Sequence, residues 1–182
     1  MREYVRGHVG FIAAIVATVA VLGFLTYSFV APSGMFSGLQ NDLKALDEGD
    51  GGTYTDLDGN PVPLSRFKGK PLIVNLWASW MPFSKDELSL MSALASERGE
   101  SVAVVAVNRM EDPATVRSYL ATFGLGQGIT VLLDPADSFY KKVGGYAMPE
   151  TLFYAKDGTL VEHKRGVLTE AELKAYVDSV AR

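Results

Sequence analysis

The sequence predicts an α/β or α+β domain, in which a central sheet carries helices on both faces, behind an N-terminal transmembrane helix. Strand and helix signals alternate from Thr53 to the end of the chain, which is the order expected of such a domain. The run VAVVAV at residues 102–107 is uninterrupted, as in strands that are covered on both faces of a sheet. No charged residue occurs between Arg6 and Asp42, so the composition of this stretch differs from that of the domain that follows.

Composition limits the chemistry that the chain can perform. The 182 residues suffice for one compact domain and an appendage, and 48% of them are hydrophobic. The chain contains no cysteine, which excludes disulfide frameworks, thiolate zinc sites, iron–sulfur clusters and cysteine nucleophiles. A formal net charge of −4 argues against a nucleic-acid partner, because a phosphate backbone favours a basic surface. We expect no metal and no cofactor.

The segment from Val9 to Val30 reads VGFIAAIVATVAVLGFLTYSFV. As a helix, these residues would extend about 33 Å, enough to cross a hydrocarbon core of about 30 Å. A buried helix of a soluble domain rarely runs so long without a charge. A cleavable signal peptide is the second alternative, since Arg2 and Arg6 are basic, but the run is longer than usual and Ser28 to Ala31 offers no small-x-small cleavage site. We therefore expect an uncleaved anchor.

The charges that flank the span predict its orientation. Two arginines precede it, whereas the first charge after it is acidic, so the positive-inside rule places residues 1–8 in the cytoplasm. Residues 9–30 then form the anchor in the membrane. Residues 31–52 are rich in Gly, Ser and Asp and are typical of a linker. Residues 53–182 form the domain, which we expect to be extracytoplasmic, either periplasmic or on the outer surface.

A short hairpin is predicted at the start of the domain. The apolar positions of Tyr54 to Leu57 and Val62 to Leu64 flank Asp58-Gly59-Asn60, a turn sequence. The string DLDGN is also similar to the first half of a calcium loop. The later ligands and the glutamate at the twelfth position are missing, so a turn is the interpretation that we adopt.

The next segments predict a strand, a helix and a second strand. Residues 72–76 (LIVNL) and 102–107 are apolar strands, and residues 83–97 form the helix between them. Apolar residues recur in this helix at intervals of three and four positions, which predicts a stripe that faces the core: Leu88, Met91, Leu94 and Ala95.

Helix caps mark the following elements. Asp112 and Pro113 are typical of an N-cap and a first helical residue, and they predict a helix that ends near Phe123. Residues 129–133 form a strand. We expect Asp137 to cap a short helix that ends at Lys142.

A second hairpin and a last helix complete the domain. Residues 151–155 and 160–164 are strands that flank the turn Asp157-Gly158. The last helix starts at Thr169, which forms a capping box with Glu172.

The run GKPLIVNLWASWMPFSKDEL, from Gly69 to Leu88, resembles the active-site strand, loop and helix of membrane-anchored thioredoxin-like proteins of the TlpA/ResA (redoxin) type. The strings VAVVAVNR, LLDPADSFYKKVGG, MPET and LFYAKDGTL extend the resemblance over Thr53 to Ala181. It implies a thioredoxin-like fold, in which a central mixed sheet is flanked by helices.

One departure from the family concerns its redox motif. In the family, the tryptophan that matches Trp80 is followed by Cys-x-x-Cys, whereas this chain has Met81-Pro82-Phe83-Ser84. A thiolate at the start of the helix would attack a disulfide, and a second cysteine would resolve the product. A thioether and a hydroxyl can do neither. Thiol–disulfide exchange is therefore excluded for this chain, and we expect no catalytic residue.

The resemblance implies a cis Met148–Pro149 bond that faces the loop from residue 81 to residue 84. Extended substrates pair with the backbone before that proline in thioredoxin folds, a form of strand addition. We expect a polypeptide-binding groove that comprises Trp80, Met81, Pro82, Phe83, Ser84, Met148 and Pro149.

Two ionisable residues have alternative interpretations. Glu87 matches an acidic position that assists proton transfer in the family, so it is either a remnant of a proton relay or a carboxylate favoured by the helix dipole. A serine nucleophile at Ser84 would need a base nearby. His8 lies across the predicted membrane, and His163 lies on the second hairpin, where we expect an ordinary exposed residue.

Three functions are compatible with these residues. The first, which we favour, is a membrane-tethered module that binds an extended polypeptide or a protein client without catalysis. The second is a thiol–disulfide oxidoreductase inactivated by the replacement of its cysteines. The third is a Cu(I)-binding protein that uses the soft thioether ligands of Met81 and Met148.

Overall fold

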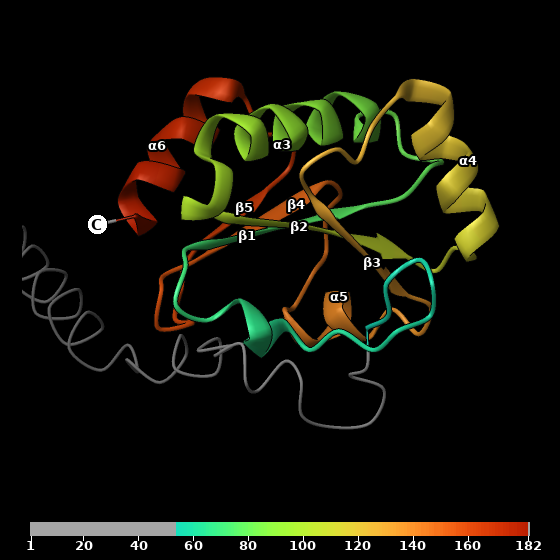
Figure 1. Ribbon diagram of the computed structural model, residues 1–182, viewed down its shortest axis with the longest axis horizontal. Coiled ribbons are helices and arrows are strands. Elements are labelled where there is room, and N and C mark those ends of the chain that lie inside the picture. The colour runs from blue at the N-terminus through green and yellow to red at the C-terminus, as the bar shows by residue number, and fades with distance from the viewer. Residues whose placement is uncertain (1–53, 182) are drawn as a thin grey trace, which may run out of the picture. The chain divides into compact units, whose positions relative to one another are not determined.

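The computed structural model describes residues 54–181. These residues form a mixed five-stranded sheet with the order β3-β2-β1-β4-β5 (Figure 1). The first three strands are parallel, and the last two are antiparallel to their neighbours. The strands are β1 (Leu72–Trp77), β2 (Ala103–Arg109), β3 (Thr130–Asp134), β4 (Glu150–Tyr154) and β5 (Leu160–Arg165).

Helices cover both faces of the sheet, as the sequence predicts. In Figure 1, α3, α4 and α6 lie on one face, and α5 and the 3-10 helix η2 lie on the other. Their bounds are η2 (Leu64–Phe67), α3 (Ser84–Arg98), α4 (Pro113–Phe123), α5 (Ser138–Lys142) and α6 (Glu170–Val180), and a 3-10 turn, η3 (Gly99–Ser101), follows α3.

Strand β1 is the centre of the core because it is buried along its whole length. Successive side chains of a strand point to opposite faces. Leu72 and Val74 therefore pack with Phe139 of α5, whereas Ile73 packs with Leu94 of α3. A strand between two helix layers favours apolar residues, as in the run LIVNLW. Its one polar residue, Asn75, donates a hydrogen bond to Glu87 (2.7 Å).

The predicted caps of α4 and α6 are confirmed. The Asp112 carboxylate accepts hydrogen bonds from the backbone N–H groups of Ala114 (2.9 Å) and Thr115 (3.0 Å). Thr169 and Glu172 form the complete capping box of α6. Such bonds satisfy N–H groups that have no partner inside the helix.

The hairpin predicted at residues 54–64 is reduced to one bridge between Thr55 and Pro61. Thr55 also bridges to Leu133, at the end of β3. The Asp56 carboxylate closes the turn by accepting from the backbone N–H of Asn60 (2.8 Å). The chain enters η2 at Leu64, so no longer ladder forms.

The prediction that Asp137 caps α5 is wrong, although the helix is present. The cap is made by Asp134, whose carboxylate accepts from the backbone N–H groups of Ser138 (2.9 Å) and Phe139 (2.8 Å). Asp137 instead pairs with the guanidinium of Arg109, Oδ1 to Nε at 2.6 Å. Arg109, which binds Asp137 in place of the helix N-terminus, lies at the end of β2 and is distant in sequence.

The predicted anchor at 9–30, the preceding residues 1–8 and the linker at 31–52 lie outside the described residues. Among the residues from 54 to 181, no helix is both long enough and apolar enough to cross a bilayer.

Candidate functional site

The residues predicted to form the groove come from two loops at one edge of the sheet. The first loop follows β1 and leads into α3, and the second precedes β4. Because Leu76 is paired with Glu150 in the antiparallel register, the end of β1 lies beside the start of β4. The predicted cis Met148–Pro149 bond is confirmed and lies at this edge.

Met81 and Ser84, which the resemblance aligns with the two cysteines of the family, are both buried. Met81 is 5% exposed and Ser84 is 1% exposed. The Ser84 hydroxyl donates a hydrogen bond to the backbone carbonyl of Ala78 (2.7 Å). The serine thus closes the loop between β1 and α3, and its hydroxyl is occupied by a structural contact.

The side chains that this loop presents to solvent are aromatic. Trp80 is 65% exposed and Phe83 is 45% exposed, and Pro82 between them is also exposed. In the facing loop, Met148 is half-buried and packs against the core, and Pro149 is buried. Of the predicted groove residues, the two aromatic side chains therefore offer the largest apolar contact.

Three further exposed apolar residues lie at the same edge of the sheet. Met110 directly follows β2, Tyr146 precedes the cis bond and Val167 follows β5. The Arg165 guanidinium lies over the Tyr146 ring, 4.8 Å from its centroid. The sequence alone does not single these residues out, but strand polarity does, since each flanks a strand at the end where Trp80 lies.

Glu87 is buried beneath α3 rather than placed on its solvent side. Its Oε1 accepts from the backbone N–H of Leu168 (3.0 Å), and its Oε2 accepts from Asn75 Nδ2 (2.7 Å). Burial raises the pKa of Glu87, and these two hydrogen bonds act in the opposite direction. The carboxyl thus binds protons more readily than an exposed glutamate does. Its role as a remnant of a proton relay stays a prediction.

A second buried carboxylate, Glu150, lies on the opposite face of the sheet. Its Oε1 accepts from the backbone N–H groups of Tyr146 (3.0 Å) and Ala147 (2.8 Å). Its Oε2 lies 2.6 Å from His163 Nε2. Burial opposes ionisation, but these hydrogen bonds outweigh it and lower the pKa of Glu150. Glu150 thereby holds the loop that precedes the cis bond.

The expectation that His163 is an ordinary exposed residue is wrong. Its side chain is largely buried and is paired with Glu150. His163 lies opposite Leu152 in the β4–β5 register, so it shares a face of the sheet with Glu150. The Ser84 hydroxyl donates to the Ala78 carbonyl, and His163 contacts Glu150. Each residue is thus hydrogen-bonded to a partner other than the one that a Ser–His pair would require.

Glu111 fixes the loop that carries Trp80. Its carboxylate accepts hydrogen bonds from the backbone N–H of Ser79 (2.7 Å), from the Ser79 hydroxyl and from Asn108 Nδ2 (2.7 Å). The end of β2 is thus tied to the end of β1. No cluster of three or more histidine, aspartate or glutamate residues capable of holding a metal ion occurs within residues 54–181.

Comparison with known proteins decides the family. Residues 40–179 match the Redoxin family. The chain belongs to this family. The matching region of this redoxin begins inside the segment predicted as a linker and extends through most of α6.

Individual relatives agree with this assignment. The redoxin is 26% identical over 127 residues to the thiol–disulfide oxidoreductase ResA of Bacillus thuringiensis, a match that covers 69% of this chain and 72% of ResA. Among solved structures, DsbF of Mycobacterium tuberculosis superposes with a TM-score of 0.64 at 21% identity, covering 79% of this chain and 96% of DsbF.

A secreted disulfide oxidoreductase of the same organism superposes with a TM-score of 0.61 at 25% identity, covering 70% of this chain and 94% of that protein. The thioredoxin-like fold and the resemblance to the TlpA/ResA type are thus confirmed, in a chain that has no cysteine.

Proposed function

We propose that this redoxin is a membrane-tethered, extracytoplasmic protein that binds an extended polypeptide without thiol–disulfide exchange. One observation carries the proposal. Buried Met81 and Ser84 occupy the two cysteine positions of the family, while Trp80 and Phe83 beside them remain exposed. The scaffold of a substrate-binding site is retained, whereas its reactive atoms are absent.

The chemistry of the two substituted residues supports a non-catalytic role. Disulfide reduction begins when a thiolate attacks a sulfur atom and forms a mixed disulfide. The Met81 thioether has no proton to lose and cannot form that bond. The Ser84 hydroxyl is committed to the Ala78 carbonyl, and oxygen cannot replace sulfur in resolving a disulfide. No other residue of the chain can substitute, because the sequence contains no cysteine.

The exposed aromatic residues support polypeptide binding. Contiguous exposed apolar side chains on a soluble surface mark interaction sites. Tryptophan is among the residues that contribute most to binding when a partner covers them. The loop that bears the cis bond is held by Glu150, so the two sides of the groove are fixed before a client binds. A preformed groove reduces the entropy lost on binding.

The sequence outside the described residues supports the tether. The apolar run at 9–30 is preceded by Arg2 and Arg6, and this arrangement favours an anchor with the domain on the outer side. The Cu(I) alternative has less support, because Met81 is buried and Met148 packs against the core.

Capture of an unfolded probe by the full chain in detergent micelles tests the proposal. The probe is a fluorescein-labelled, reduced and carboxymethylated polypeptide, and binding is measured by fluorescence anisotropy. We expect the wild-type chain to bind it and Phe83→Asp to weaken binding by about tenfold or more, as for an aromatic anchor of an interface.

Val161→Asp is the matched control, because Val161 is also exposed but lies at the opposite end of β5 from the site. Its affinity should equal that of the wild type. If the wild-type chain does not bind the probe, or if Phe83→Asp binds it as tightly, the groove is instead a relic of an inactivated oxidoreductase.

A further inference from the structure

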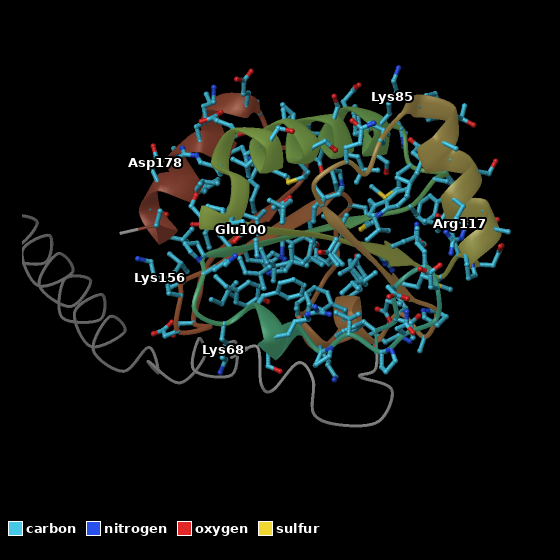
Figure 2. The ribbon with its side chains drawn as sticks, in the orientation of Figure 1. Lys68, Lys85, Glu100, Arg117, Lys156 and Asp178 are labelled. Atoms are coloured by element: carbon cyan, nitrogen blue, oxygen red, sulfur yellow. The ribbon has the colours of Figure 1, made fainter. Side chains whose placement is uncertain are left out.

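A basic patch lies at the edge of the sheet opposite the groove. It comprises Arg66, Lys68, Lys70 and Lys156, all of which are exposed. Arg66 lies in η2, and Lys68 and Lys70 lie between η2 and β1. The backbone N–H of Gly69 donates to the carbonyl of Lys156 (2.8 Å). These four residues are termed the basic edge. Figure 2 shows Lys68 and Lys156 on the side of the domain where β1 begins.

The basic edge contrasts with the charge of the whole chain. The chain has 21 acidic and 17 basic residues, so acidic residues are in excess outside these four positions. Two exposed acidic residues lie beside the basic edge: Asp157 follows Lys156 in the sequence, and Glu100 Oε2 lies 3.7 Å from Lys70 Nζ. This ion pair is loose and exposed, and such pairs are screened by salt. The basic edge therefore has more basic than acidic residues, whereas the chain as a whole has more acidic than basic ones.

The basic edge also borders a pocket that is lined by polar and apolar residues. Its lining includes Arg66, Lys68, Lys70 and Glu100, together with Phe67, Val102 and Val104. An anionic surface attracts this edge and repels the acidic residues that are in excess elsewhere, so it selects one orientation. We propose that the basic edge binds the anionic phospholipid headgroups of the membrane in which the chain is tethered.

The proposal rests on the tether of the proposed function. Lysine and arginine clusters beside a membrane segment are attracted to anionic lipids, and the attraction fades within a Debye length of about 8 Å. A tethered domain stays near the surface at a high effective concentration, so a weak attraction is enough to orient it.

The orientation would place the groove away from the bilayer. Lys70 precedes β1, and Trp80 follows it. The six residues of β1 span about 20 Å. In Figure 2, Lys85, which follows the Trp80 loop, lies on the side of the domain opposite Lys68 and Lys156. Binding through the basic edge therefore presents Trp80 and Phe83 to clients in the solvent.

The absence of cysteine allows a single fluorophore to test this orientation. The full chain carrying Thr159→Cys, next to the turn of Lys156, is labelled and reconstituted into phosphatidylcholine vesicles, with or without about a third of phosphatidylglycerol. A nitroxide on the lipid headgroup quenches the dye. We expect quenching to rise about twofold with the anionic lipid, and to lose this rise at about 1 M salt, where the Debye length is about 3 Å.

For a label at Lys85→Cys, at the far edge, quenching by the headgroup nitroxide should not rise with the anionic lipid. The triple variant Arg66→Glu, Lys68→Glu and Lys70→Glu should abolish the rise at position 159. The matched variant Lys85→Glu, Lys141→Glu and Lys174→Glu should retain it. Equal quenching in neutral and anionic vesicles, or an unchanged triple variant, overturns the inference.

Failure of the inference is distinguishable from failure of the proposed function. Retention of the chain in neutral vesicles reports the tether alone, and capture of the unfolded probe reports the groove alone. A chain that is retained and captures the probe, but shows no effect of anionic lipid, contradicts only the role of the basic edge.

Discussion

Ser84 and Met81 retain the positions of the family's cysteines but make different contacts. The Ser84 hydroxyl donates to Ala78 across the loop, and the backbone N–H of Met81 donates to the same carbonyl (3.1 Å). Both residues are therefore part of the turn between β1 and α3. A turn fixed in this way keeps Trp80 and Phe83 at the surface without any thiol.

The proposed lack of thiol–disulfide exchange follows from the absence of the two thiols, so introducing them should restore this activity. We expect the variant Met81→Cys with Ser84→Cys to catalyse the reduction of insulin by dithiothreitol, whereas the wild-type chain leaves the uncatalysed rate unchanged. Position 81 lies in the loop that enters α3 at Ser84, and the N-terminal N–H groups of a helix lower the pKa of a thiol placed near them. Turbidity of the insulin B chain reports the rate.

The variant Met81→Cys alone is the control, because it lacks the second thiol that resolves a mixed disulfide. It should form the mixed disulfide without turnover. A double variant that is folded by circular dichroism and still does not accelerate insulin reduction would show that the site lacks more than the two thiols.

The sequence predicts which residues the two loops of the candidate site carry, but it does not predict their exposure. The resemblance places Trp80, Met81 and Ser84 in one loop and predicts the cis bond before Pro149. Whether a side chain of that loop points to the core depends on the turn that Ser84 closes. The burial of His163 likewise depends on Glu150, which lies on the neighbouring strand.

Among the elements, α6 shows how a local signal fixes a boundary. Thr169 and Glu172 satisfy each other's backbone N–H groups. The preceding residue, Leu168, is buried and donates its N–H to Glu87. The start of α6 is therefore coupled to the carboxyl beneath α3. Loss of the cap should thus lower the free energy of unfolding of the whole domain.

We expect Thr169→Ala to lower the free energy of unfolding by about 1 kcal/mol, the usual cost of a lost N-cap. Urea unfolding of the full chain in detergent, followed by circular dichroism, measures the change. Thr169→Ser keeps the hydroxyl and should cost much less. Equal losses in the two variants would assign the effect to the methyl group of the threonine and not to the cap.

Predictions made for elements succeeded where the signal was local. The caps of α4 and α6 are short-range patterns, and both are confirmed. The cap of α5 was assigned to Asp137, yet Asp134 makes it because Arg109 binds Asp137. The first hairpin also failed, since Thr55 divides its bridges between Pro61 and Leu133. Both errors arise from partners that are distant in sequence.

At the scale of the whole molecule, the sheet separates two buried carboxylates. Glu87 lies beneath α3 on one face, and Glu150 lies on the face that α5 covers. Burial dominates at Glu87 and raises its pKa. Hydrogen bonds dominate at Glu150 and lower its pKa. The two groups should therefore affect the stability of the folded domain with opposite dependence on pH.

The sign for Glu87 follows from its proton binding. Above the ordinary value of 4.5, the unfolded chain has released this proton while the folded domain still binds it. The stability contributed by Glu87 therefore falls as pH rises from 4.5 through the folded pKa. Glu87→Gln removes this titration. As the pH increases from mildly acidic to neutral, we therefore expect the melting temperature of this variant to increase relative to that of the wild type.

Glu150 has the opposite sign. Its folded pKa lies below 4.5, so its contribution to stability is present above that value and is lost as pH falls through the folded pKa. Glu150→Gln should destabilise the domain at neutral pH, by about 1–3 kcal/mol, because it weakens the partner of buried His163. The deficit should shrink in acid, where the wild-type carboxyl also becomes protonated.

Thermal unfolding of the full chain in detergent, from acidic to neutral pH, measures both variants against the wild type. Glu162→Gln, on the less buried β5 strand, controls for the removal of one charge. Because the two buried carboxyls are on opposite faces, their effects should add in the double variant. If both single variants shift with pH in the same direction, then net charge, and not the separate environments of Glu87 and Glu150, governs the pH dependence.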